Sequence, residues 1–74
     1  MNNITPKEKE VLALMAEGLS SKEIAERLFI SFHTVRSHRR NLRLKFDAKN
    51  SSELMMKALS STLIETGIGD FRRN

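Results

Sequence analysis

The sequence predicts an all-α fold of four helices, and three observations lead to this prediction. The chain of 74 residues contains only three Gly and one Pro, so it has little of the turn chemistry that β-hairpins need. A capping side chain followed three residues later by Glu occurs at Thr5, Ser20 and Asn50, and each such pair marks a helix start. Apolar residues recur at helical spacing after each of these starts. A chain of this length forms one domain at most and buries only about 60% of its unfolded surface, which favours a partner subunit.

The first helix is predicted to begin at Pro6 and to end before Gly18. Thr5 can cap it, Pro6 occupies the first helical position where its missing N–H costs nothing, and Glu8 completes a capping box. Gly18 is placed to end the helix in the left-handed conformation. The apolar stripe of this helix is predicted to be core and consists of Val11, Leu12, Leu14, Met15 and Leu19.

A second, short helix is predicted over about residues 21–27, with Ser20 and Glu23 as cap and box. Its inner face is formed by Ile24, Ala25 and Leu28. Residues 29–31 then break the apolar pattern, and Ser31 can cap a third helix. A short helix, a turn of three or four residues and a second helix form the helix-turn-helix layout, although the turn here lacks the Gly that often stands in it.

Residues 31–46, which contain the third helix, account for the chain's net charge of +4. They hold five of its 13 Lys and Arg residues and none of its nine Asp and Glu residues. A solvated helix face normally interleaves the two signs, because opposite charges three or four residues apart stabilise each other. Concentrated positive charge without partners in its own helix suits a polyanion, and nucleic acid is the commonest one for a small domain. The basic residues are Arg36, Arg39, Arg40, Arg43 and Lys45, together with His33 and His38.

The third helix is predicted to have two separate faces, because successive residues of a helix turn by about 100°. The side expected to dock on the core carries Val35, Leu42 and Phe46. A different side carries Arg36, Ser37, Arg40 and Arg43, with His33 nearby. Arg39 lies near the apolar edge, from which its head group can extend to a phosphate.

We therefore predict that the third helix enters the major groove of double-stranded DNA. Arg36 and Arg40, one turn apart, would reach base edges, most naturally the two acceptors of guanine. Arg43, on the same side of the helix, would hold the register on the backbone without reading sequence. Two alternatives stay open here: an Arg face that is merely solvated, and a protein-interaction module in which DNA contact is vestigial. RNA is disfavoured, since Trp and Tyr are absent and no sheet with stacking aromatics is predicted.

A fourth helix is predicted to begin after Asn50, with Glu53 in the box position. Its apolar residues cover more than one stripe and comprise Leu54, Met55, Met56, Ala58, Leu59, Leu63 and Ile64. Two apolar sides predict two surfaces to bury, one against the core and one against a partner, with simple exposure of a Met as the alternative. Residues 67–69 are expected to end the helix and residues 70–74 to form a frayed tail.

Enzymatic, metal-binding and membrane functions are disfavoured by the residue inventory. The absence of Cys excludes a disulfide scaffold and most zinc sites and fits a reducing cytoplasm. No Gly-rich phosphate loop is present, and His33 and His38 lie about 140° apart around a helix, so they cannot chelate one metal from a single face. The N-terminal segment lacks the apolar stretch of a signal peptide, and no apolar run is long enough to span a membrane. We expect a cytoplasmic, non-enzymatic domain without a cofactor or metal.

In order and spacing, these residues resemble the LuxR/FixJ-type (GerE-like) helix-turn-helix domain of bacterial transcription regulators. The resemblance runs without gaps from about Ile4 to Ile64. It rests on Glu8-x-Glu10-Val11-Leu12, Gly18, Lys22-Glu23-Ile24-Ala25, Ile30-Ser31-x-x-Thr34-Val35, and His38 followed by Asn41. Two positions depart from the family pattern: Asp47 stands where a Gly is frequent, and Ser51 where an Arg is frequent.

The resemblance implies a four-helix, wingless helix-turn-helix domain over residues 1–66, with the motif at about 21–40 and a tail at 67–74. The base contacts that it implies are Arg36, Ser37 and Arg40. The phosphate contacts that it implies are Ser21, Lys22 and Thr34, with His38 and Arg43 as additions. It also implies a homodimer through the fourth helix, for which the candidate residues are Leu54, Met55, Met56, Leu59 and Leu63. Expected partners are double-stranded DNA, an N-terminal receiver or ligand-binding domain, and RNA polymerase.

Overall fold

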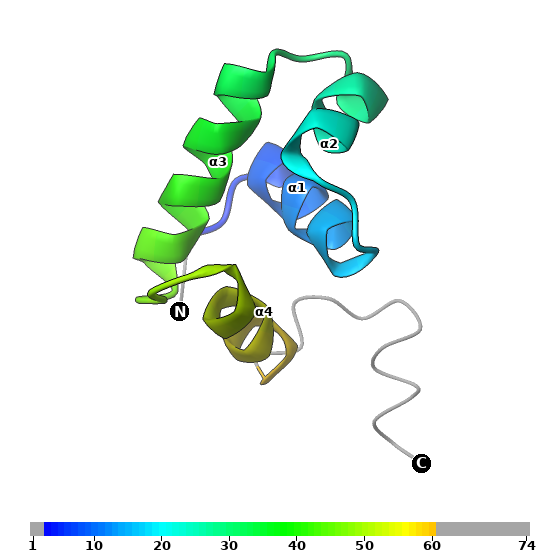
Figure 1. Ribbon diagram of the computed structural model, residues 1–74. Coiled ribbons are helices and arrows are strands. Elements are labelled where there is room, and N and C mark those ends of the chain that lie inside the picture. The colour runs from blue at the N-terminus through cyan, green and yellow to red at the C-terminus, as the bar shows by residue number, and fades with distance from the viewer. Residues whose placement is uncertain (1–2, 61–74) are drawn as a thin grey trace.

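A computed structural model describes residues 3–60 of the chain, and within this range the fold consists of four α-helices without a strand (Figure 1). The helices are α1 (Pro6–Ala16), α2 (Ser21–Leu28), α3 (Phe32–Lys45) and α4 (Ser51–Ser60). The all-α, four-helix prediction is confirmed, and α2 extends one residue beyond its expected end. The expected end of the fourth helix, the boundary at residue 66 and the tail at 67–74 lie outside the described residues.

Side chains cap all four helix starts. The first two form the complete capping boxes that the sequence predicts. At α3, the Ser31 hydroxyl accepts the N–H three residues on at 2.9 Å. At α4, Asn50 caps as predicted with a 2.8 Å bond to the Glu53 N–H, but the Glu53 carboxylate accepts from the Lys49 N–H instead of closing a box on the cap. The polar starts therefore satisfy backbone donors that would otherwise have no partner.

The first three helices end in the same way, through one residue with a left-handed backbone. These residues are Gly18 (φ +92°), Phe29 (φ 58°) and Asp47 (φ 55°). In each case the N–H of the following residue reaches back five positions to a helix carbonyl, at 3.2, 3.1 and 2.8 Å respectively. This is the Schellman arrangement, which Gly adopts most readily. The prediction for Gly18 is confirmed, and Phe29 supplies the left-handed residue of a turn that has no Gly.

The core lies between the helices, and α3 packs against all three of the others (Figure 1). Seven side chains in it have no exposed surface: Val11, Leu12, Ile24, Val35, Leu42, Leu54 and Ala58. Phe46, just beyond α3, is also buried. Because Val35, Leu42 and Phe46 all turn inward, the opposite flank of α3 must face away from the core, as the sequence predicts.

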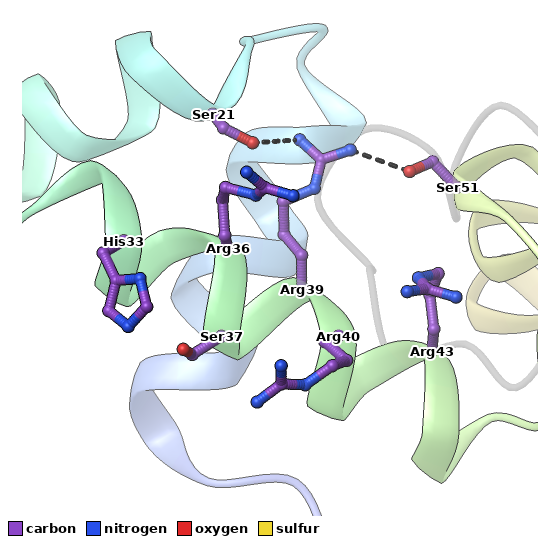
Figure 2. Close-up of a pocket in the computed structure, with 8 residues that line it drawn as sticks. All are labelled: Ser21, His33, Arg36, Ser37, Arg39, Arg40, Arg43 and Ser51. Atoms are coloured by element: carbon purple, nitrogen blue, oxygen red, sulfur yellow. Dashed lines mark hydrogen bonds between the residues drawn. The ribbon is translucent and has the colours of Figure 1, made fainter.

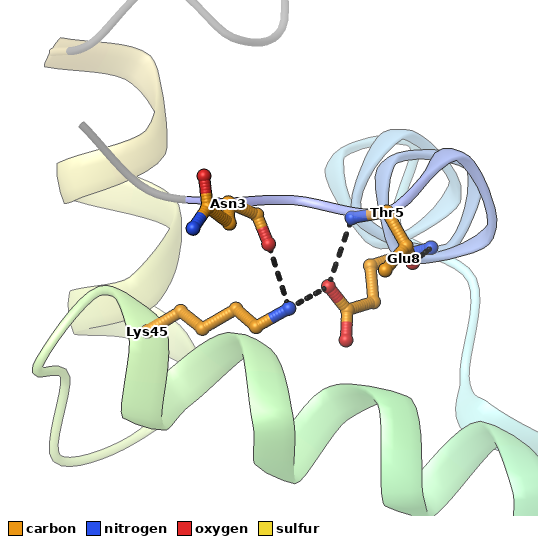
Figure 3. Close-up of polar contacts among 4 residues, drawn as sticks. All are labelled: Asn3, Thr5, Glu8 and Lys45. Carbon is orange, nitrogen blue, oxygen red and sulfur yellow. Dashed lines mark hydrogen bonds and ion pairs between the residues drawn. The ribbon is translucent and has the colours of Figure 1, made fainter.

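A buried ion pair ties the N-terminal segment to the last turn of α3 (Figure 3). Lys45 Nζ lies 2.6 Å from Glu8 Oε1 and donates to the Asn3 carbonyl at 2.7 Å. Glu8 is only 4% exposed. Burial by itself would raise the pKa of Glu8, but the hydrogen bonds from Lys45 and the Thr5 N–H, with the nearby positive charges, lower that pKa below its ordinary value. One of the five cations of the basic segment is therefore neutralised by an acid of the same domain.

Candidate nucleic-acid interface

A hollow of about 510 Å³ lies where the starts of α2 and α4 approach the outer flank of α3. We call it the cationic hollow. Its eight lining residues carry guanidinium, imidazole or hydroxyl groups, and none carries a carboxylate (Figure 2). They are Ser21, His33, Arg36, Ser37, Arg39, Arg40, Arg43 and Ser51. The hollow thus gathers four Arg side chains with no acid among them to neutralise their charge.

The position of each cation follows from the way α3 docks. His33, Arg36 and Arg40 are exposed and lie on the flank that the buried apolar residues leave free. Ser37 and Arg43 are half-buried on the same flank. The structure therefore brings together five predicted contact residues: Ser21, Arg36, Ser37, Arg40 and Arg43.

Arg39 connects three helices within the hollow (Figure 2). From α3 it donates to Ser21 Oγ at 2.8 Å and to Ser51 Oγ at 2.7 Å. These two Ser residues are the first residues of α2 and α4. Burial, and then the charge of Arg43, lower the pKa of Arg39 below its ordinary value, but a guanidinium stays protonated in proteins. Arg39 therefore holds the three helices in register while adding a positive charge to the hollow.

The electrostatic character of the hollow is positive for a second reason. Both α2 and α4 begin at it, and a helix start carries a partial positive charge from its unpaired N–H groups. An anion placed in the hollow would meet four guanidinium groups and two helix starts together. Phosphate and the acceptor edges of bases are the biological anions and acceptors that suit guanidinium geometry.

Arg36 has an aromatic partner that sequence reasoning missed. Its guanidinium carbon lies 5.8 Å from the ring centre of Phe32, the first residue of α3. A cation over an aromatic face at this distance is attracted by the ring quadrupole. The available signal was the spacing of four residues between an aromatic side chain and an Arg in a predicted helix.

Three predicted phosphate contacts lie outside the hollow. Lys22 follows Ser21 at the start of α2 and is exposed. Thr34 is half-buried, and its hydroxyl accepts from the Ser31 hydroxyl at 2.8 Å. His38 is half-buried on the other flank of α3, on the side of buried Glu8. The structure thus separates His38 from the cationic flank, and its phosphate contact stays a prediction.

The predicted dimer residues of α4 do not share one environment. Leu54 has no exposed surface and belongs to the domain's own core, which corrects its assignment to a partner surface. Met55 and Leu59 are partly buried and pack against that core. Met56 is 69% exposed. Leu63 lies outside the described residues.

Residues 3–60 hold neither a metal site nor a membrane-spanning helix. No group of three or more His, Asp or Glu side chains there is arranged to hold a metal ion. In the same range, every helix is too short or too polar to cross a bilayer.

The chain is similar to known regulatory proteins. Residues 2–58 match the family described as bacterial regulatory proteins, luxR family (GerE). Over 62 residues the chain is 39% identical to the oxygen regulatory protein NreC of Staphylococcus haemolyticus and 40% identical to NreC of Staphylococcus aureus. Each match covers 84% of this chain but only 29% of NreC.

Two crystal structures share the fold. The response regulator ChrA of a heme-sensing two-component system matches with a TM-score of 0.81 at 30% identity, over 86% of this chain and 32% of ChrA. The phage VqmA–DPO complex matches with a TM-score of 0.82 at 29% identity, over 97% of this chain and 33% of the VqmA chain. The similarity therefore extends over nearly all of this chain and about a third of each of those proteins.

Proposed function

The chain belongs to the luxR family of bacterial regulatory proteins, and on this premise we propose that it binds double-stranded DNA sequence-specifically as the DNA-binding part of a transcriptional regulator. The observation that carries the proposal is the cationic hollow, which gathers four Arg side chains without a carboxylate. Duplex DNA carries one negative charge per about 1.7 Å of its axis. A flank of unneutralised guanidinium groups on an exposed helix is the complementary surface.

In the proposed complex, α3 lies in the major groove with the hollow toward the DNA. The groove is about 12 Å wide and admits one α-helix. Arg36 and Arg40 are exposed and one turn apart, so each can reach a base edge, and guanine offers two acceptors in the geometry of a guanidinium. Ser37 lies between them on the same flank and can contact either kind of base.

The remaining contacts would fix the register on the sugar–phosphate backbone. Ser21 and Lys22 lie in the first turn of α2, and Arg43 lines the hollow farther along α3. Thr34 is proposed as a further phosphate contact near the start of α3. Arg39 acts as a positioning residue, because its two hydrogen bonds hold the starts of α2 and α4 beside the reading flank.

The first test separates base reading from backbone contact. Binding sites are selected from random duplex DNA, and affinities for a selected site and for random DNA are measured by fluorescence anisotropy. Arg40→Ala should weaken the selected site by about 1–3 kcal/mol and relax the preference at one base pair. Arg43→Ala should weaken both DNAs alike. Arg27→Ala is the matched control, since Arg27 is exposed on α2 and does not line the hollow.

Equal losses on selected and random DNA for Arg40→Ala would remove its assignment to base reading. The salt dependence tests the phosphate contacts. Two cations, Lys22 and Arg43, would release counterions, so a rise from 50 to 200 mM salt should weaken random-DNA binding about tenfold for each bound copy. Loss of either cation should flatten that dependence by about one unit, and salt-independent or undetectable binding would instead favour a protein-interaction module.

We further propose that two copies pair through α4 on the DNA. The support is the exposed Met56, flanked by the partly buried Met55 and Leu59. A dimer would read two half-sites about one helical turn apart. Sedimentation with and without DNA should show a dimer that Met56→Glu weakens and Phe29→Glu does not, since Phe29 is an equally apolar but separate exposed residue. A monomer in both states would contradict this proposal.

Other partners are proposed from the share of the relatives that the chain covers. The match takes in 29% of NreC, so this chain corresponds to less than a third of that regulator. A receiver or ligand-binding domain is the proposed N-terminal partner, and RNA polymerase is the proposed partner at a promoter. A pull-down of the polymerase by the DNA-bound chain tests the second, with the free chain as the control.

A further inference from the structure

The N-terminal end of α3 carries an exposed aromatic ring, that of Phe32. Phe32 is the first residue of α3, directly after the capping Ser31, and 50% of its surface is exposed. The core residues of α3 begin only at Val35. An apolar ring in this position is not used to build the domain's interior, so half of it remains available for contact with a ligand.

The ring is linked to the proposed reading flank through Arg36. The Arg36 guanidinium lies over the ring at 5.8 Å, and Arg36 also lines the cationic hollow. No carboxylate competes for this guanidinium among the residues that line the hollow. The pair therefore presents a flat apolar surface and a forked donor side by side, along the same flank of one helix.

We propose that Phe32 is a specificity-determining residue that contacts the C5-methyl group of a thymine next to the guanine read by Arg36. This inference rests on the proposed DNA binding and adds a second base to it. The thymine methyl is the apolar feature of the major groove, and it is the group that Phe side chains contact there. A guanidinium already held by the ring loses less conformational freedom when it binds the guanine.

The geometry limits where the thymine can be. Residues four apart on a helix are about 6 Å apart along its axis. Successive bases on one strand are about 3.4 Å apart. A helix lying along the groove would therefore place the base contacted by Phe32 within two base pairs of the guanine contacted by Arg36.

The test changes the DNA and leaves the protein intact. The probe is a duplex selected from random DNA by the wild-type chain, with each thymine replaced in turn by deoxyuridine, which lacks only the methyl group. Arg36→Ala first identifies the guanine, as the base pair at which the sequence preference relaxes. Within two base pairs of it, one replacement should weaken wild-type binding about fourfold, the effect of withdrawing one methyl-sized apolar group.

Protein variants then assign that effect to the ring. Phe32→Ala should bind the thymine and deoxyuridine duplexes equally. Phe32→Leu, which retains an apolar side chain without the ring quadrupole, should keep a preference for thymine. Phe29→Ala is the matched control, because Phe29 is 93% exposed in the preceding turn and should leave the fourfold ratio unchanged. Circular dichroism establishes that each variant is folded.

The outcomes separate this inference from the proposed function. Sequence-specific binding with no deoxyuridine effect within two base pairs of the guanine would overturn the role of Phe32 and leave DNA binding standing. An effect that persists unchanged in Phe32→Ala would also overturn it. Absence of any salt-sensitive DNA binding would instead remove the proposed function itself, and this inference with it.

Discussion

Replacement of Arg39 by Met should destabilise the domain more than replacement of its neighbour Arg40. Arg39 donates two hydrogen bonds, to Ser21 Oγ at 2.8 Å and to Ser51 Oγ at 2.7 Å. Hydrogen bonds to a charged group contribute about 1.5–3 kcal/mol each when they are shielded from water. The full value is not lost in Arg39→Met, because Arg39 is only half-buried, water can hydrate both hydroxyls, and the repulsion from Arg43 disappears. We therefore expect the free energy of unfolding to fall by about 1–2 kcal/mol.

The assay is thermal and urea unfolding followed by circular dichroism. For a domain of this size, a loss of 1–2 kcal/mol lowers the Tm by roughly 5–15 °C. Arg40→Met makes the same change of charge and shape at an exposed position, and its effect should stay within about 0.5 kcal/mol. Ser21→Ala and Ser51→Ala each remove one of the bonds, and each should couple to Arg39→Met in a double-mutant cycle. Equal Tm values for the two Arg variants would refute the bridging role.

Two further predictions concern Glu8 and Phe29. The pKa of Glu8 is lowered in the fold from an ordinary value of 4.5, so its contribution to stability is present above pH 4.5 and is lost as the pH falls through the folded-state pKa. Tm values measured from pH 7 to pH 3 should therefore fall more steeply for the wild type than for Glu8→Gln. Parallel curves for the two proteins would contradict this prediction. Phe29→Gly should raise the free energy of unfolding by roughly 0.5 kcal/mol, because Phe29 has a left-handed backbone that Gly adopts without strain, and its exposed ring contributes little packing. The greater conformational freedom of Gly in the unfolded chain offsets only part of this gain. Urea unfolding measures this, with Phe29→Ala as the control that should show no gain.

The helices could be predicted from the sequence because their starts depend on neighbouring residues. Thr5 and Ser20 bond within three residues of themselves, and such contacts form wherever the sequence occurs. Gly18 likewise marks a helix end by its own backbone freedom. The left-handed Phe29 carries no such mark, because a Phe there is tolerated only when the rest of the turn requires that conformation.

The cationic flank was also predictable, because the helical angle separates Arg36 and Arg40 from the buried residues of α3. The bridge from Arg39 to Ser51 was not, since it joins residues of two helices whose packing the pattern does not define. His38 and Thr34 were assigned to phosphate from family positions, and both assignments stay predictions. At 100° per residue, each lies about 200° from Arg36, on the side of α3 away from the hollow.

Leu54 shows a related limit on sequence reasoning. The apolar residues of the fourth helix form more than one stripe, and periodicity alone does not tell which stripe turns inward. The structure puts Leu54 and Ala58 in the core and leaves Met56 outside. The choice is made by the packing of α3 against α4, which no local pattern records.

The ion pair between Lys45 and Glu8 makes the electric field around α3 asymmetric. One side of this helix presents guanidinium groups whose charge is uncompensated within the hollow, and the other presents an ammonium whose charge is cancelled by a carboxylate 2.6 Å away. A long-range attraction therefore acts on one side only and turns the molecule about the axis of α3 before any contact is made. An encounter with a charged cylinder would accordingly begin with the docking side already facing it.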